Sequence, residues 1–145
     1  MEFEPLLLPG IHDITKSDLS NHFASPFSNQ EKRIQLIERF NYLIVKVELI
    51  GIPFEIWING SFVTNKEEPN DIDIVFFFDP VKVNYLPADK KILLEEVANN
   101  AFSKYRYNCD VYFIPNDNQV LRSYWRGWFG YTRSETPKGF ARITV

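Results

Sequence analysis

Residues 54–78, FEIWINGSFVTNKEEPNDIDIVFFF, decide the fold because they contain two apolar runs joined by a polar linker. Phe54–Ile58 and Asp71–Phe78 are rich in β-branched and aromatic residues. Turn-forming residues bound both runs, so each is predicted to be a strand. The sheet, and any site on it, should therefore be built around this stretch.

Asp71 and Asp73 stand at the start of the second strand, in an otherwise strongly apolar segment. Residues two apart in a strand face the same side of the sheet, so both carboxylates should project together. Ile72 and Ile74 should then enter the core on the opposite side. Two neighbouring carboxylates repel each other unless a cation lies between them, and Mg²⁺ is the natural candidate. The alternative, more common for an isolated pair, is a solvated strand start beside a turn.

Apolar spacing and breaking residues predict further elements on both sides of this stretch. The expected helices cover residues 29–50, 87–105 and 117–129, with a short one near 17–23, and the expected strands cover residues 109–114 and 140–145. The rest of residues 1–27 should form an extended arm. Because helices alternate with strands, the predicted fold class is α/β (α+β), a small mixed sheet flanked by helices.

The 145 residues are expected to form one domain. Its core should be residues 54–114, followed by a C-terminal helix and strand in residues 117–145. Ser28 and Glu31 have capping-box spacing, and Asp117 should cap the last helix. The expected buried faces consist of Ile34, Ile37, Phe40, Ile44 and Val47 in the first long helix, and of Leu94, Ala98, Ala101 and Tyr105 in the second.

The composition is that of a folded protein, with 45% apolar residues, 16% aromatic residues and a net charge of −3. This charge indicates neither a nucleic-acid coat nor an acidic tail. A local cationic surface is expected in the C-terminal part, where only Glu135 is acidic. The basic residues there are Arg122, Arg126, Arg133, Lys138 and Arg142.

Cys109 is the one cysteine, which excludes an intramolecular disulfide and fits a reducing compartment. It should point into the core and be inert. The N-terminal residues resemble neither a signal peptide nor a membrane span, so a cytoplasmic protein without a membrane partner is expected. His12 and His22 lack metal-ligand spacing with the cysteine, so a zinc site is not predicted.

Two further features favour a phosphate and metal site over a plain turn. Gly60 follows a predicted strand, where glycine lets the backbone approach a ligand closely, and Ser61 should begin a helical turn that can hold a phosphate. A strand-ending turn with a helix cap is the alternative. Asp110 is another carboxylate inside an apolar strand. If its strand neighbours that of Asp71 and Asp73, three acids share one face, as in two-metal sites for phosphoryl transfer.

Together these residues resemble the signature of the DNA polymerase β-type nucleotidyltransferase superfamily. The matching pattern is Gly60-Ser61, nine intervening residues, Asp71-Ile72-Asp73-Ile74, and Asp110 on a later strand. Including Leu8–Asp13 and Trp125–Gly130, the whole chain is also similar to a family of small, stand-alone, uncharacterised bacterial nucleotidyltransferase-like proteins. The resemblance implies the nucleotidyltransferase fold, with its core over residues 54–114.

The resemblance also implies a reaction. Gly60 and Ser61 would hold the β- and γ-phosphates of a nucleoside triphosphate, with ATP expected. Asp71 and Asp73 would bind Mg²⁺, while Asp110 would bind a second Mg²⁺ and help to deprotonate the acceptor. A hydroxyl on a protein, an RNA or a small molecule would then receive the NMP, with release of pyrophosphate. Lys66 and Lys138 are candidate triphosphate contacts, or else ordinary solvated lysines.

Two other interpretations remain open. The small size is closest to the branch of antitoxins that add nucleotides to a partner toxin. The main alternative to catalysis, motivated by the aromatic and basic C-terminal third, is a binding module of the same fold that docks on a partner in an antitoxin or defence complex. A nuclease or phosphatase using the same acids is less favoured, because it needs no triphosphate cradle at Gly60-Ser61.

Residues 121–133, LRSYWRGWFGYTR, place Arg122 and Arg126 one helical turn apart among aromatic residues. Arginine and aromatic side chains together can bind a phosphate and stack a base. The favoured interpretation is an amphipathic helix with its aromatic residues in the core and its arginines in solvent.

Overall fold

A five-stranded mixed sheet with strand order β1-β5-β2-β3-β4 forms the centre of the molecule. The structure is a computed structural model that describes residues 3–145. Its strands are β1 (Gly10–Asp13), β2 (Phe54–Asn59), β3 (Ile72–Phe78), β4 (Cys109–Pro115) and β5 (Gly139–Thr144). The predicted fold class, a mixed sheet flanked by helices, is confirmed.

The two predicted strands of the opening stretch lie at the centre of this sheet. β2 and β3 pair antiparallel, with Asn59 opposite Asp73, and β4 joins β3 in parallel, with Asp110 beside Asp73. On the other side β5 pairs antiparallel with β2 and parallel with β1. Because β3 and β4 are parallel, their starts, which carry Asp73 and Asp110, lie side by side at the same end of the sheet.

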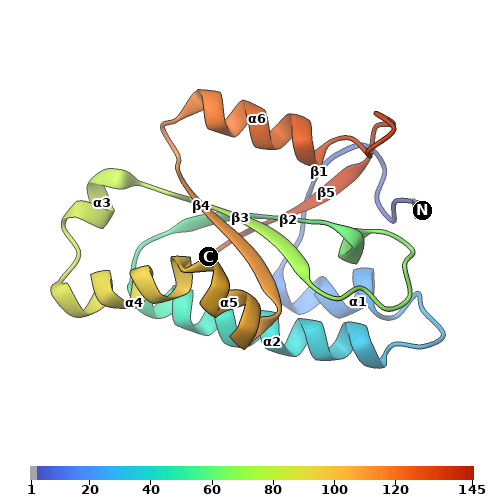
Figure 1. Cartoon of the computed structure of the whole chain (residues 1–145), viewed down its shortest axis with the longest axis horizontal. Coiled ribbons are helices and arrows are strands. Elements are labelled where there is room, and N and C mark those ends of the chain that lie inside the picture. The colour runs from blue at the N-terminus through green and yellow to red at the C-terminus, as the bar shows by residue number, and fades with distance from the viewer. Residues whose placement is uncertain (1–2) are drawn as a thin grey trace.

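Helices cover the two faces of the sheet unequally (Figure 1). One face carries α1 (Leu19–Phe23), α2 (Glu31–Ile50), α4 (Ala88–Ala98) and α5 (Asn100–Tyr107), whereas α6 (Gln119–Phe129) lies on the other. Three short helices complete the fold: η1 (Lys16–Asp18), η2 (Ser61–Val63) and α3 (Pro80–Asn84).

The buried residues form two clusters, one on each face. The larger lies between the sheet and the helices α1, α2, α4 and α5, and includes Ile72 and Ile74 as predicted. The smaller lies under α6 and consists of Trp57, Val75, Phe77, Phe129 and Phe140. Because α6 alone covers this second face, the polar strand starts beside it are left accessible.

The first long helix is confirmed, but its predicted start and one predicted core residue are wrong. Gln30 is the N-cap of α2, and the Ser28 hydroxyl donates to Glu67 rather than capping the helix. Ile34 is 42% exposed, while the neighbouring Arg33 is fully buried. Ile37, Phe40, Ile44 and Val47 are buried as predicted. The error is therefore confined to the first turn, where a charged side chain takes a place in the core.

The second long helix is divided, and its predicted face is wrong after the break, whereas Leu94 packs against the core as predicted. Asn99 has ψ of 107°, ends α4 and caps α5 by accepting a hydrogen bond from the Phe102 amide. The break changes which side of the helix faces inward, so Val97, Ser103 and Tyr107 are buried while Ala101 and Tyr105 are exposed.

Three smaller expectations are also corrected. Asn118, not Asp117, caps α6, because its side chain accepts a hydrogen bond from the Leu121 amide. α3 begins after Asp79, where no helix was predicted. Residues 1–2 of the predicted arm lie outside the described residues, and the remainder contains β1 and η1 as well as the predicted short helix α1. Within residues 3–145, the helices are all too short or too polar to span a membrane.

Candidate functional site

The ends of β2, β3 and β4 bring three polar side chains to one face of the sheet. Asn59, Asp73 and Asp110 occupy neighbouring register positions on these strands. Directly paired residues of adjacent strands point to the same face, and this is the face that carries α6. Asp71 lies one residue before β3. It lines the same cavity as Asp73, as the alternation of side chains along a strand predicts. The sequence prediction that the strands of Asp73 and Asp110 are neighbours is confirmed.

Gly60 lets Asp73 lie against the end of β2. Its φ of 84° and ψ of −165° belong to a region that is almost restricted to glycine. A Cβ atom at this position would stand 2.6 Å from Asp73 Oδ2 and 2.9 Å from its carboxyl carbon. Ser61 then begins the short helix η2, as predicted. The glycine therefore permits both the turn and the close approach of a carboxylate to it.

A cavity of about 1170 Å³ opens between these strand ends and α6. Its wall includes six of the seven predicted site residues, namely Gly60, Ser61, Lys66, Asp71, Asp73 and Lys138. The seventh, Asp110, does not belong to the lining residues. The cavity also takes residues from α6 and from the loop that joins it to β5.

Asp110 is held outside the cavity by its own neighbours. Its Oδ1 accepts a hydrogen bond of 2.6 Å from the Asn100 side chain, and its Oδ2 accepts one of 3.5 Å from the Tyr112 hydroxyl. Asp71 Oδ2 lies 3.9 Å from the Lys104 ammonium. Among residues 3–145, no three acidic, histidine or cysteine side chains converge as a metal-ligand set. The three aspartates thus lie on one side of the sheet, but the carboxylates of Asp71 and Asp110 are directed to different partners.

The electrostatics single out Asp73. Burial raises the pKa of this carboxyl to about 6, and the negative charges of Asp71 and Asp110 add to the effect, while Lys138 and Lys104 oppose it. Asp73 therefore binds a proton more tightly than an ordinary aspartate does. Cys109, just before Asp110, is fully buried, and burial raises the pKa of its thiol, as expected for an inert core cysteine.

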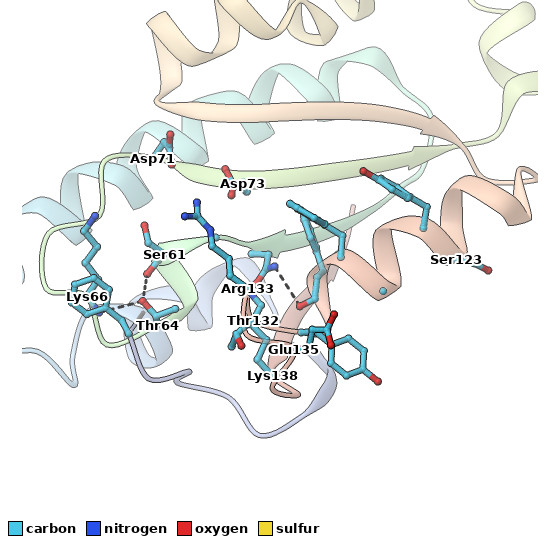
Figure 2. A pocket seen from close by; sticks show the side chains of 18 residues that line it. Ser61, Thr64, Lys66, Asp71, Asp73, Ser123, Thr132, Arg133, Glu135 and Lys138 are labelled. Carbon is cyan, nitrogen blue, oxygen red and sulfur yellow. Dashed lines mark hydrogen bonds between the residues drawn. The ribbon is translucent and has the colours of Figure 1, made fainter. Parts of the chain in front are cut away.

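Positive side chains approach the same cavity from two loops. Figure 2 shows Lys66 beside Ser61 on the β2–β3 loop, and Arg133 directed from the α6–β5 loop toward Ser61 and Asp73. The Lys66 ammonium also lies over the Phe3 ring, 5.8 Å from its centroid. Of the predicted cationic surface, Arg133 and Lys138 line the cavity.

The other arginines of that predicted surface have different roles. Arg122 is half-buried, donates to both Glu55 carboxylate oxygens at 2.7 and 2.8 Å and lies 4.6 Å from the Phe77 ring centroid. Arg142 forms two hydrogen bonds to Asp13. The expectation that Arg122 is a solvated arginine is therefore wrong, because it is stacked and paired over the second core.

A buried arginine of α2 supports the loop between β2 and β3. Arg33 of α2 donates hydrogen bonds to the carbonyl groups of residues 23, 62, 64 and 66, at 2.6–2.9 Å. Its guanidinium carbon also lies 3.8 Å from the Phe27 ring centroid. Three of these carbonyls lie in the five residues after Ser61, and the last belongs to Lys66. Arg33 thus fixes the backbone that carries two predicted phosphate contacts.

Comparison with known proteins places the chain in a family. Residues 1–144 match a family of unknown function, DUF6932. The chain belongs to DUF6932. No curated protein and no solved structure matches it.

In this DUF6932 protein the site contains residues that sequence reasoning did not select. Asn59 is buried, and its Oδ1 is one of two buried side-chain atoms without a hydrogen-bond partner in residues 3–145. Its position at a strand end before Gly60 was the available signal. Arg133 gave only a weak signal, because its place over the cavity depends on the turn at residues 131–137.

Proposed function

We propose that this cavity is the substrate site of a Mg²⁺-dependent nucleotidyltransferase that moves an NMP from a nucleoside triphosphate, with ATP expected, to an acceptor hydroxyl. The observation that carries the proposal is the meeting of Gly60-Ser61, Asp71, Asp73, Lys66 and Lys138 around one cavity. Of these residues, Gly60-Ser61, Asp71 and Asp73 match the order and type of the superfamily signature, and the mixed sheet is compatible with the nucleotidyltransferase fold. The acceptor would be a protein, an RNA or a small molecule.

The donor chemistry fits Mg²⁺, which prefers carboxylate oxygens. Asp71 and Asp73 both line the cavity, and the pKa of Asp73 is raised by burial and, to a smaller extent, by the charges of Asp71 and Asp110. A bound cation would favour the ionised carboxylate against both effects. Asp71 and Asp73 would hold the ion, and bound Mg²⁺ would neutralise charge on the phosphates. Asp110 would join them as a ligand of a second ion only by exchanging its contacts with Asn100 and Tyr112.

The protein's own groups would position the reactants. Ser61, Lys66, Lys138 and Arg133 would bind the phosphates. The acceptor oxygen would bond to the α-phosphorus as the bond from that phosphorus to the bridging oxygen breaks, and pyrophosphate would leave. The acceptor's proton would pass to a carboxylate, for which Asp110 is the proposed group. Catalysis would come mainly from orientation and charge neutralisation.

The test follows the label of ATP. With Mg²⁺ and candidate acceptors, the protein should transfer label from ATP labelled at the α-phosphate and none from ATP labelled at the γ-phosphate. Asp73→Asn should lose the transfer. Asp79→Asn is the matched control, because Asp79 lies just past the far end of β3 and caps α3. Transfer that survives Asp73→Asn would overturn the proposal.

A second function is favoured by the aromatic residues around the cavity. Tyr124, Trp128 and Tyr131 are all exposed there, and exposed aromatic residues are common in protein interfaces. The protein could therefore dock on a partner, such as a toxin, without catalysis. Co-purification of one partner protein, unchanged by Asp73→Asn and with no label transfer, would favour this alternative.

A further inference from the structure

α6 carries two aromatic faces, and only one of them belongs to the core. Trp125 and Phe129 pack inward, in ring contact with each other at a centroid distance of 5.6 Å. Tyr124, Gly127, Trp128 and Tyr131 instead line the cavity. The spacing of Tyr124, Gly127 and Trp128 places these three residues along one side of the helix. Tyr131 lies two residues beyond the end of α6, in a β-bridge with Pro137. We call these four residues the α6 wall.

The wall presents aromatic rings to the cavity rather than to the protein. Tyr124, Trp128 and Tyr131 are 57%, 64% and 50% exposed. The Tyr124 ring packs edge-to-face against that of Trp125, at a centroid distance of 5.3 Å. Trp125 is itself held by Tyr112 and Phe129. The wall therefore offers large, preorganised apolar surfaces that the fold leaves uncovered.

Gly127 keeps space free in the middle of the wall. A glycine inside a helix is unfavourable compared with alanine, so it needs a reason. A Cβ atom at Gly127 would meet nothing within 4 Å, so packing does not require a glycine there. Because Gly127 also lines the cavity, its missing side chain enlarges the room between Tyr124 and Trp128. That room is bounded by aromatic rings on the same helix.

The remaining cavity wall is charged. Lys66, Arg133 and Lys138 line it together with Ser61 and three acids, Asp71, Asp73 and Glu135. A ligand that satisfies the whole cavity must therefore combine a flat apolar ring with a phosphate-rich end. A nucleoside triphosphate has this chemistry. A partner protein's side chain would supply the ring but not the phosphates.

We propose that the α6 wall is the nucleobase-binding subsite of the cavity, with the purine ring of ATP stacked against Trp128 and Tyr124 over Gly127. The inference rests on the proposed function and extends it by assigning the base to α6. Stacking on aromatic rings uses the π-face that every base has, so the wall selects for a base without fixing which one.

Isothermal titration in Mg²⁺ buffer with ATP, adenosine and inorganic tripolyphosphate tests this assignment. Trp128→Ala should weaken ATP binding about tenfold or more and leave tripolyphosphate binding unchanged. Gly127→Leu should have the same pattern, because leucine favours a helix but fills the open space. Circular dichroism of each variant checks that α6 remains folded.

One further variant is a matched control, and another tests a second residue of the α6 wall. Tyr105→Ala removes a tyrosine that is 85% exposed on α5, outside the cavity, and should change no affinity. Tyr124→Ala, on the wall, should weaken ATP and adenosine alike. In the wild-type protein adenosine should quench tryptophan fluorescence. Trp128→Phe should reduce that quenching, since Trp57 is buried and Trp125 is partly buried.

The outcomes separate this inference from the function on which it rests. If ATP binding depends on Asp73 and Ser61 but not on Trp128 and Gly127, the subsite is overturned while the proposed function stands. If adenosine binding depends on the wall but tripolyphosphate does not bind, the subsite stands and the triphosphate site is overturned. If neither ATP nor adenosine binds, both are overturned.

Discussion

Gly60 and Asp73 pack against each other in the candidate site, and each constrains the other. The strand end can turn at Gly60 only through a backbone conformation that side chains avoid. The Asp73 carboxylate occupies the space that a side chain at residue 60 would need. The packing of the carboxylate against the Gly60 backbone therefore helps to fix its position.

Gly60→Ala should therefore destabilise the protein by about 3 kcal/mol or more, because backbone strain and displacement of Asp73 add. Gly51→Ala is the matched control. Gly51 also has a positive φ, 88°, but its Cβ would meet nothing within 4 Å, so the loss should be about 1–2 kcal/mol. Denaturant unfolding of both variants measures the difference. Equal losses would show that the contact with Asp73 adds nothing.

The raised pKa of Asp73 makes stability depend on pH. The ordinary value is 3.8 and the folded value about 6, so between about pH 4 and 6 the folded chain binds a proton that the unfolded chain does not. The free energy of unfolding should therefore fall as the pH rises through this window, by up to about 3 kcal/mol. Above the window this contribution should be constant.

Asp73→Asn should remove this dependence. The variant should be more stable than the wild type at pH 7.5 and similar to it at pH 4, when both are measured by thermal unfolding in a buffer with a metal chelator. Asp79→Asn, at a capping position, should follow the wild type. A wild-type curve that rises between pH 4 and 6 relative to Asp73→Asn would contradict the assignment.

At the scale of the element, α2 supports the site through Arg33. Its guanidinium is fully buried and contacts carbonyl groups rather than a carboxylate. Burial lowers its pKa to about 10, still well above neutrality. A charged side chain in the core thus ties the loop of Ser61 and Lys66 to the longest helix.

Arg33→Lys should cost about 3 kcal/mol or more, because one ammonium group cannot reach four carbonyls and leaves buried acceptors unpaired. Arg39→Lys on the same helix is the control. Arg39 donates to the exposed side chain of Asn108, so its replacement should cost about 0.5 kcal/mol or less. Urea unfolding of both variants tests this. A loss for Arg33→Lys no larger than for Arg39→Lys would refute the role.

The same elements show what sequence patterns could predict. Strands β2, β3 and β4 were predictable because each is an apolar run between turn residues. Arg33 was not, because helical spacing points to Ile34 and a single sequence does not reveal carbonyl groups that arrive from another loop. The break at Asn99 was not predicted because it depends on a single side chain, which ends α4 and caps α5, within a stretch of otherwise helical spacing.

The candidate site was predictable as a set of residues but not as an arrangement. The alternation of residues along β3 predicted that Asp71 and Asp73 share a side of the sheet. The structure shows that Asp110 of β4 is paired with Asp73. The hydrogen bonds from Asn100 and Tyr112 to Asp110 arise from α5 and β4 packing, which no motif encodes. The aromatic residues of α6 divide between core and cavity because the helix is covered on one side only.

At the scale of the whole molecule, the sheet is best protected at its centre. β2 and β3 have a partner strand on both sides, whereas β1 and β4 are edge strands. In hydrogen exchange followed by mass spectrometry, amides of β2 and β3 should exchange last, and those of β1 and of residues 131–137 first. Faster exchange in β3 than in β1 would contradict the sheet order.

The pairing of β1 with β5 also has a consequence for synthesis on the ribosome. Residues 10–13 can join the sheet only after residues 139–144 have been made, because β5 is their partner. The strands β2, β3 and β4 have no such wait, since each finds its neighbour within residues 54–115. The growing chain can therefore bring the strand starts that carry Asp73 and Asp110 together before α6 has emerged. The last contact to form would be the one that brings the two ends of the described chain together.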